Sequence, residues 1–363
     1  MLEETEREEL RQFIGRMYEE SLAFKFWRGI GRMFAWLPGA RGMELPLLVS
    51  SLVVISASIL VPALLARLVG ALEFFSQANL TYIVSSSIWA WLSINIAEWQ
   101  IKQSINSIQS NLPDILEFPE GEGEAMKWVE FVASRRNQII AVVSLFAMMS
   151  VFSGLGMKFD YSQPVGWVLL AHLVMGLIWC VFHISWIGAL ILFYGYYFSR
   201  LSLRLFQDNP GSTLPLLALH RSAGQLMLVS ALIAALAIPV GVITKMLTSL
   251  TLIMSVVTLW IPLLAFYIAM ERGFSLHIRV AKKQRLSDLQ EQISLIEKRG
   301  KTPDVGTAEL IQRMLEIHEG VRRTPDSLVN VESLANLFSS LALPMLGGLV
   351  KLYEMWKQFL GIP

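Results

Sequence analysis

Seven stretches of the chain contain no Asp, Glu, Lys or Arg, and six of them are about long enough to cross a bilayer as a helix. Hydrophobic residues make up 54% of the chain and charged residues 16%, against about a quarter in soluble domains. We therefore expect an all-α fold, a polytopic membrane helical bundle with seven transmembrane helices. The stretches are Leu45–Ala66, Leu80–Ala97, Asn137–Met157, Tyr161–Ser199, Ser222–Thr244, Met246–Met270 and the shorter Ser333–Val350.

The fourth stretch is long enough for two thin spans, but no Pro or Gly-rich turn follows Pro164 to reverse the chain. We expect one tilted helix that leaves the bilayer near Tyr196.

The basic residues indicate the orientation. Of the 30 Lys and Arg residues, 25 lie in alternate flanking segments: 1–44, 98–136, 200–221 and 271–332. Because Lys and Arg are retained on the cytoplasmic side, the N-terminus is expected inside and the C-terminus outside, in a multi-pass protein of the inner or plasma membrane. Alternatively, the last stretch lies on the membrane and leaves the tail inside.

Four regions follow from this topology. They are a cytoplasmic or interfacial amphipathic helix (1–42), a six-helix transmembrane region (43–270), a cytoplasmic helical hairpin (271–329) and the seventh helix with a short external tail (330–363). Aromatic residues alternate with Lys25, Arg28 and Arg32 in the first region. This pattern fits either a helix in the headgroup layer or one that packs on cytoplasmic helices.

The segments between the spans predict a helical cytoplasmic layer. Ile101, Ile105, Ile108 and Leu112 continue the second helix beyond the bilayer to near Pro113. The acidic run 117–128 is interpreted as a solvated loop, with divalent cation binding as the less favoured alternative.

Two apolar stripes predict the hairpin, because their spacings of three and four let the two helices face each other. Thr324 and Pro325 suit the first positions of the helix that leads into the last stretch. Segment 284–323 is the expected contact for a cytoplasmic protein partner. The stripes are Leu286, Leu289, Ile293 and Ile296, then Leu310, Met314, Ile317 and Val321.

The fourth stretch contains His172 and His183, which are 11 residues apart and thus about 16 Å apart on one helix face. That distance is too great for one metal ion. The two histidines mark either a polar path through the membrane or neutral rings bonded to a carbonyl or serine. Cys180 is the single cysteine and is expected to pack as a small apolar residue. Glu98 is expected to form an interfacial ion pair with Lys102.

Catalytic signatures are absent from the sequence: there is no HExxH, no GxSxG and no carboxylate pair within a span. We expect no enzyme activity, no cofactor and no metal. A net charge of +1 gives no bias towards nucleic acid.

The last stretch carries a small, weakly polar face formed by Ser340, Pro344, Gly347 and Gly348. Such a face suits close helix packing, or it lines a pore when several subunits surround an axis.

The runs LWIPLLAFYIAMERGFSLHIRVAKKQRL and TPDSLVNVESLANLFSSLALPMLGGLVKLYE resemble the C-terminal third of uncharacterised prokaryotic multi-pass membrane proteins, over roughly residues 260–355. In that family the corresponding turn contains an aromatic residue, which the turn Thr324–Ser327 lacks. The resemblance implies no activity for this chain. The architecture is also similar to seven-helix insect chemoreceptor channels, which are tetramers with the last helix at the pore.

The leading expectation is a homo-oligomeric, channel-like membrane protein that assembles through its cytoplasmic helical layer and has its last helix near the pore.

 Two alternatives stay open: a non-conducting sensor or scaffold that signals through the hairpin, and a small-solute transporter. The transporter is disfavoured because the sequence has no internal repeat and no evident buried charge for ion coupling.

Overall fold

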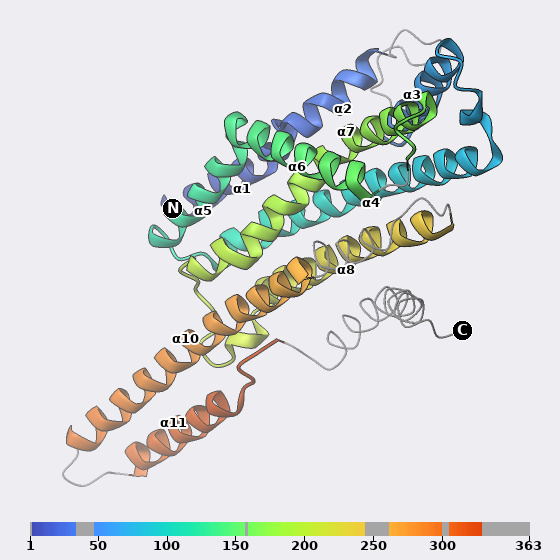
Figure 1. Cartoon of the computed structure of the whole chain (residues 1–363). Helices are drawn as coiled ribbons and strands as arrows, with labels where there is room; N and C mark the ends of the chain where they lie inside the picture. Colours follow the sequence, from blue (N-terminus) through green and yellow to red (C-terminus); the bar gives the residue numbers. More distant parts are fainter. Residues whose placement is uncertain (1, 34–46, 157–158, 244–260, 300–304, 329–363) are drawn as a thin grey trace, which may run out of the picture.

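The computed structural model describes residues 2–33, 47–156, 159–243, 261–299 and 305–328, and the regular structure in these ranges is helical (Figure 1). This result confirms the all-α class. One isolated antiparallel bridge joins Leu116 and Leu203. The α-helices are α1 (Leu2–Glu19), α2 (Leu22–Met33), α3 (Leu47–Leu68), α4 (Gln77–Ile115), α5 (Glu120–Ala133), α6 (Arg135–Gly156), α7 (Pro164–Leu192), α8 (Leu214–Ile243), α10 (Ile261–Arg299) and α11 (Val305–Arg323).

Within the described residues, four helices are long and apolar enough to cross a membrane. Their segments are Ser51–Leu68, Gln77–Ile115, Pro164–Arg200 and Leu214–Ile233. They correspond to the first, second, fourth and fifth apolar stretches. The third stretch is helical as α6. Residues 246–260 of the sixth stretch and all of the seventh lie outside the described residues, so the count of seven stays a prediction.

The fourth stretch forms one continuous helical segment, as expected. Helix α7 runs to Leu192 and continues through a π-helical turn (η2, Phe193–Tyr197) and a 3₁₀ turn (η3, Phe198–Arg200). Tyr196 is exposed while its neighbours Phe193 and Tyr194 are fully buried. This end of the segment therefore packs one face into the protein core and exposes the other, and an exit from the bilayer near Tyr196 stays a prediction.

Helix α4 is the central element of the bundle. Its 39 residues extend over about 58 Å, nearly twice a hydrocarbon core of about 30 Å. It packs along α7 and α8, and α1 lies against its C-terminal half (Figure 1). The predicted stripe is buried here: Ile101, Ile105, Ile108 and Leu112 are at most 3% exposed.

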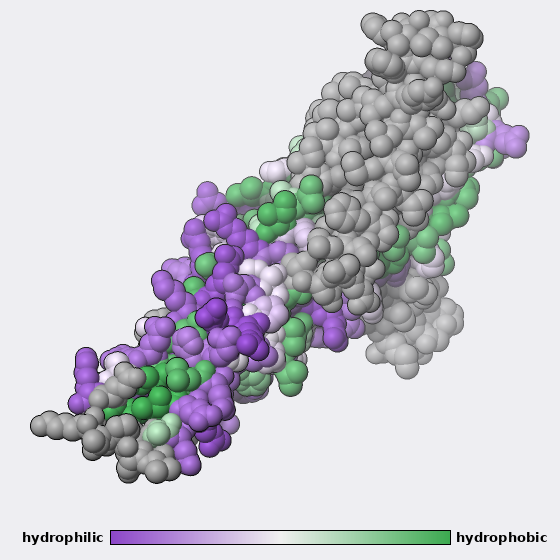
Figure 2. Space-filling view, turned by 90° about the horizontal axis from the view of Figure 1, so that it is seen from below, coloured by the Kyte–Doolittle hydropathy of each residue, from purple (hydrophilic) through white to green (hydrophobic). Residues whose placement is uncertain are grey.

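The segments rich in Lys and Arg gather at one end of the bundle. The largest buried cluster joins α1, the C-terminal half of α4, α5, the end of α7, the start of α8 and the first turns of α10. The hairpin of α10 and α11 extends from this end (Figure 1), and the surface there is mostly hydrophilic (Figure 2). One folded helical layer is thus attached to the apolar helices.

The N-terminal region forms two helices whose apolar faces pack on protein. Leu10, Ile14 and Met17 of α1 are buried in the core of the layer, and Trp27 of α2 is buried against α3 and α4 residues. Lys25 and the other basic side chains of α2 are exposed. Helix α1 thus packs on the layer, whereas α2 packs on the apolar helices, and placement of either helix in the headgroup layer stays a prediction.

The loop predicted for residues 117–128 is wrong from Glu120 onward, where α5 begins. Trp128 and Val129 are fully buried, so tertiary packing stabilises a helix in spite of two glycines. Gly121 is required by its neighbours, because a Cβ there would lie 2.7 Å from the carbonyl oxygen of Ser202. No group of His, Cys, Asp or Glu side chains in the described part of the chain is arranged to hold a metal ion.

The predicted hairpin is present, since α10 and α11 pack against each other and bury Leu289, Met314 and Val321. Leu310 of the predicted stripe is instead 50% exposed. The predicted helix start at Thr324 and Pro325 is wrong. The Thr324 hydroxyl donates to the carbonyl of Val321 at 2.7 Å, and the chain is non-helical from there to Leu328. A threonine after a helix can close that helix as readily as it caps the next one.

The contact between α10 and η3 includes a histidine whose protonation opposes folding. His277 donates from Nε2 to the carbonyl of Phe198 at 2.7 Å, and burial lowers its pKa, an effect that this hydrogen bond partly offsets. A buried histidine with a lowered pKa favours the folded protein when the ring is neutral.

We therefore expect folded stability to fall as pH drops from about 6.5, the usual histidine pKa, through the lower pKa of His277. His277→Gln keeps a donor and removes the titration, so its melting temperature should depend less on pH than that of the wild type. His318→Gln, on the surface of α11, is the control. Equal slopes between pH 5 and 7 for all three proteins would contradict the expectation.

Candidate functional site

A buried carboxylate lies where the apolar part of α4 meets the helical layer. Glu98 is 6% exposed, and its Oε1 lies 2.9 Å from Nζ of Lys102, one helical turn further along α4. The Lys102 side chain is half exposed. The predicted ion pair is therefore present, but its acid lies inside the protein rather than at an open interface.

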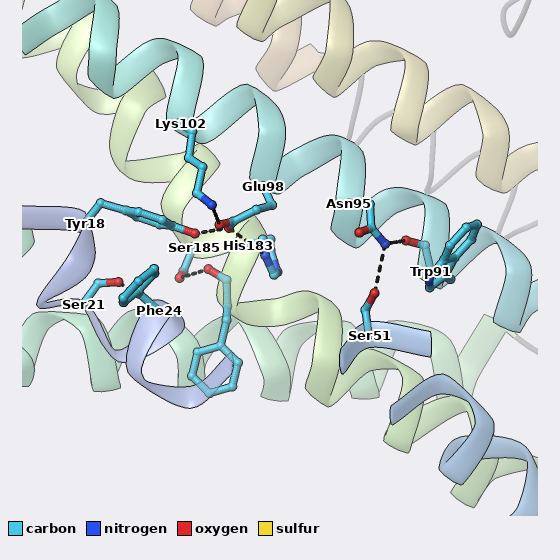
Figure 3. Close-up of polar contacts among 11 residues, drawn as sticks. Tyr18, Ser21, Phe24, Ser51, Trp91, Asn95, Glu98, Lys102, His183 and Ser185 are labelled. Atoms are coloured by element: carbon cyan, nitrogen blue, oxygen red, sulfur yellow. Dashed lines mark hydrogen bonds and ion pairs between the residues drawn. The ribbon is translucent and has the colours of Figure 1, made fainter. Parts of the chain in front are cut away.

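Helix α1 brings a phenol to the same carboxylate. The Tyr18 hydroxyl donates to Oε2 of Glu98 (Figure 3). Tyr18 is itself buried, and its ring meets Trp186 edge-on with 5.2 Å between the ring centres. Burial, and then the negative charge of Glu98, raise the pKa of Tyr18 far above its usual value, so the phenol stays protonated and remains a donor.

Helix α7 brings an imidazole. His183 is 1% exposed, and its Nε2 lies 3.3 Å from Oε2 of Glu98 without the alignment of a hydrogen bond. Its Nδ1 has no hydrogen-bond partner among the described residues. Trp27 of α2 covers the ring, with 5.8 Å between centres.

Together, Tyr18, Glu98, Lys102 and His183 form what we call the Glu98 cluster. Side chains from three helices meet at one carboxylate, as Figure 3 shows. A buried charge is expensive, so a change in the charge of this cluster would alter how strongly Glu98 is held by its neighbours. The cluster is thus suited to changing the packing of α1 against α4 and α7.

No protein-family model, curated protein or solved structure matches this chain.

The sequence indicates a polar role for His183 and an ion pair between Glu98 and Lys102, but it does not indicate that the two features meet. The sequence also argues against a transporter because it shows no buried charge, and the burial of Glu98 removes that objection. Nothing in the local sequence of α1 identifies Tyr18 as a partner, because the two residues are 80 positions apart.

His172 lies in a separate polar group. Its Nδ1 is 2.7 Å from the carbonyl oxygen of Ser58 and its Nε2 is 3.0 Å from the Ser86 hydroxyl. Trp179 donates to the Ser58 hydroxyl at 2.8 Å. These are the carbonyl and serine partners expected of a histidine with a structural role. A polar path from His172 to His183 stays a prediction.

Cys180 lies between the two histidines in sequence and is buried in an apolar cluster with Val54, Ile55, Ala90 and Ile94. This packing agrees with the expectation for the lone thiol. The suggested pore residues Ser340, Pro344, Gly347 and Gly348 lie outside the described residues.

A second buried acid–histidine pair joins α8 to α10. His220 Nε2 lies 2.8 Å from Oε1 of Glu271, and both side chains are at most 15% exposed. The sequence places Glu271 directly after the sixth apolar stretch and His220 two residues before the fifth, but it does not show that the two residues meet. The pair fastens the base of the hairpin helix to the bundle.

Proposed function

We propose that this chain is a multi-pass membrane protein that acts as a sensor, in which the Glu98 cluster couples the membrane helices to the cytoplasmic helical layer. The observation that carries the proposal is the burial of Glu98 against His183 and Tyr18. Burying an ionisable pair of this kind is costly, and such pairs are concentrated at functional sites.

The path of coupling follows the helices themselves. Helices α4 and α7 each run from apolar surroundings into the layer, and α1 touches both at Tyr18. A change in the charge of the cluster would weaken the hold of Glu98 on Tyr18, Lys102 and His183. The N-terminal helix would then loosen from the ends of both membrane helices.

The hairpin supplies a surface through which the sensor would contact its partner. Leu295, Leu310 and Leu315 are 45% to 51% exposed. Figure 2 shows hydrophobic surface near the far end of the hairpin, inside a hydrophilic region. These features support contact with a soluble partner over 284–323, or with another copy of the chain.

The test measures the distance between α1 and α4 in a Cys180→Ala background. Spin labels at the exposed positions Gln12 and Asn106 should give a distance that differs between pH 8 and pH 5 in lipid nanodiscs. Glu98→Gln should remove that difference. Labels at Asn106 and Gln225, on the tightly packed helices α4 and α8, are the control pair.

The same distance distribution at both pH values in the wild type would refute the sensor proposal. A pH response that persists in Glu98→Gln would refute the role of this cluster.

A channel formed by several copies is the second candidate. It is favoured by the contacts of Lys282 on α10, which donates to the carbonyl of Thr324 and to Asp326 in the segment that leads into residues 329–363. Movement of the hairpin would thus reach the last apolar stretch directly. Enlarging Ser340 or Gly347 should change the ion selectivity or size of flux from liposomes, and no flux above empty liposomes would end this candidate.

A further inference from the structure

An apolar groove of about 320 Å³ lies between α6 and α7, next to the end of α5. Ala141 and Leu145 form one wall, and Gly188, Ala189 and Leu192 form the other. Gly188 leaves the groove open, because a Cβ built there meets nothing within 4 Å. An apolar hollow of this kind is filled more favourably by hydrocarbon than by water.

The groove opens towards a surface that only an apolar environment would cover. Ile139, Ile140, Val143 and Met148 of α6 are 48% to 59% exposed. Single exposed apolar residues are ordinary, but a helix with this many is typical of contact with lipid or with another subunit.

The cytoplasmic mouth of the groove is basic. Asn137 and Gln138 line this end, and Arg135 and Arg136 directly precede them, exposed and without an ion pair to any described residue. The amide oxygen of Gln138 accepts from the backbone of Leu22 at 2.8 Å, which brings the start of α2 and its exposed Lys25 to the same mouth.

From this combination we infer that the groove binds one acyl chain of an anionic phospholipid, with the phosphate near Arg135 and Arg136. Basic side chains at the cytoplasmic ends of membrane helices attract anionic headgroups, and the apolar groove behind them receives the chain. The ligand would also touch Trp186, which lines the groove and packs on Tyr18 of the Glu98 cluster.

Native mass spectrometry of the purified full chain tests the inference, with phosphatidylglycerol and phosphatidylcholine as the added lipids. Phosphatidylglycerol should bind more tightly to the wild type. Replacing Arg135 and Arg136 with glutamine should weaken its binding by about fivefold for each arginine and leave phosphatidylcholine almost unchanged. Replacing Arg221 and Arg272, which are exposed elsewhere on the layer, is the charge-matched control.

Larger side chains in the walls of the groove test whether the acyl chain lies there. Gly188→Leu, and separately Ala141→Leu, should reduce the bound fraction of both lipids. Gly224→Leu adds the same side chain to α8 at a position that also has open space, and should not. The two variants change opposite walls, so if one of them misfolds the other still tests the groove.

Three results would overturn the inference: equal affinity for the two lipids, unchanged phosphatidylglycerol binding in the arginine variants, or unchanged lipid binding in both filled-groove variants. Loss of a dimer in Gly188→Leu without loss of lipid would assign the groove to a second copy. Glu98→Gln should bind lipid as the wild type does, so this outcome is independent of the sensor proposal.

Discussion

Replacing Glu98 with alanine is expected to lower the stability of the folded chain by about 2 to 4 kcal/mol. The change leaves the buried Tyr18 hydroxyl without an acceptor, which costs about 1 to 3 kcal/mol for a buried polar group. It also leaves a cavity and removes the carboxylate that lies beside His183. Lys102 adds little, because its half-exposed ammonium can turn to water. A fall of about 5 to 10 °C in the melting temperature in detergent is the measurable result.

Two comparisons isolate the buried carboxylate. Glu98→Gln keeps an acceptor for Tyr18 and should cost less than Glu98→Ala. Glu124→Ala removes a carboxylate that pairs with Lys127 on the surface of α5, where such pairs contribute under about 1 kcal/mol. If Glu98→Ala and Glu124→Ala had the same melting temperature, the buried carboxylate of Glu98 would not stabilise the fold as described above.

Stability and signalling can be separated at this cluster. A triple variant, Tyr18→Phe with Glu98→Leu and His183→Leu, replaces the polar groups with apolar ones of similar size. Buried ionic groups replaced in this way often leave stability unchanged or higher. The triple variant is therefore expected to recover most of the stability lost in Glu98→Ala while lacking the pH response between α1 and α4.

The features predicted correctly from the sequence are those set by neighbours three and four residues apart. The stripe from Ile101 to Leu112 and the facing stripes of α10 and α11 follow from helical periodicity, which the chain carries locally. The continuous helix through Tyr196 follows from the absence of a turn signal over the preceding thirty or so residues. Length and apolarity in the same way predicted the helices α3, α4, α7 and α8.

The features that the sequence did not predict depend on contacts between distant segments. Helix α5 looked like a loop because of its glycines and glutamates, and only the burial of Trp128 explains why it is helical. The Glu98 cluster needs α1 to fold back on α4 and α7. Thr324 carried an ambiguous signal, since the same hydroxyl can end one helix or begin another.

Replacing Lys282 with alanine is expected to speed the cleavage of the segment after α11 by about 5- to 30-fold. The Lys282 side chain is 13% exposed and donates to the Thr324 carbonyl at 2.8 Å and to Asp326 at 2.7 Å. Asp326 is mostly exposed, so we assign most of the effect to the carbonyl bond and expect about 1 to 2 kcal/mol for local opening. Trypsin cuts after Arg322 and Arg323, which are exposed at this point.

Lys283→Ala is the matched control, because it removes an equally cleavable lysine from the next, exposed position. Cleavage of a folded protein follows the population of the opened segment when opening and closing are fast. Rates at Arg322 and Arg323 that agree within twofold for the two variants would show that Lys282 does not hold this segment. Faster cleavage in Lys282→Ala alone would mean that Lys282 fastens the segment after α11 to α10, which is the link that the channel candidate requires.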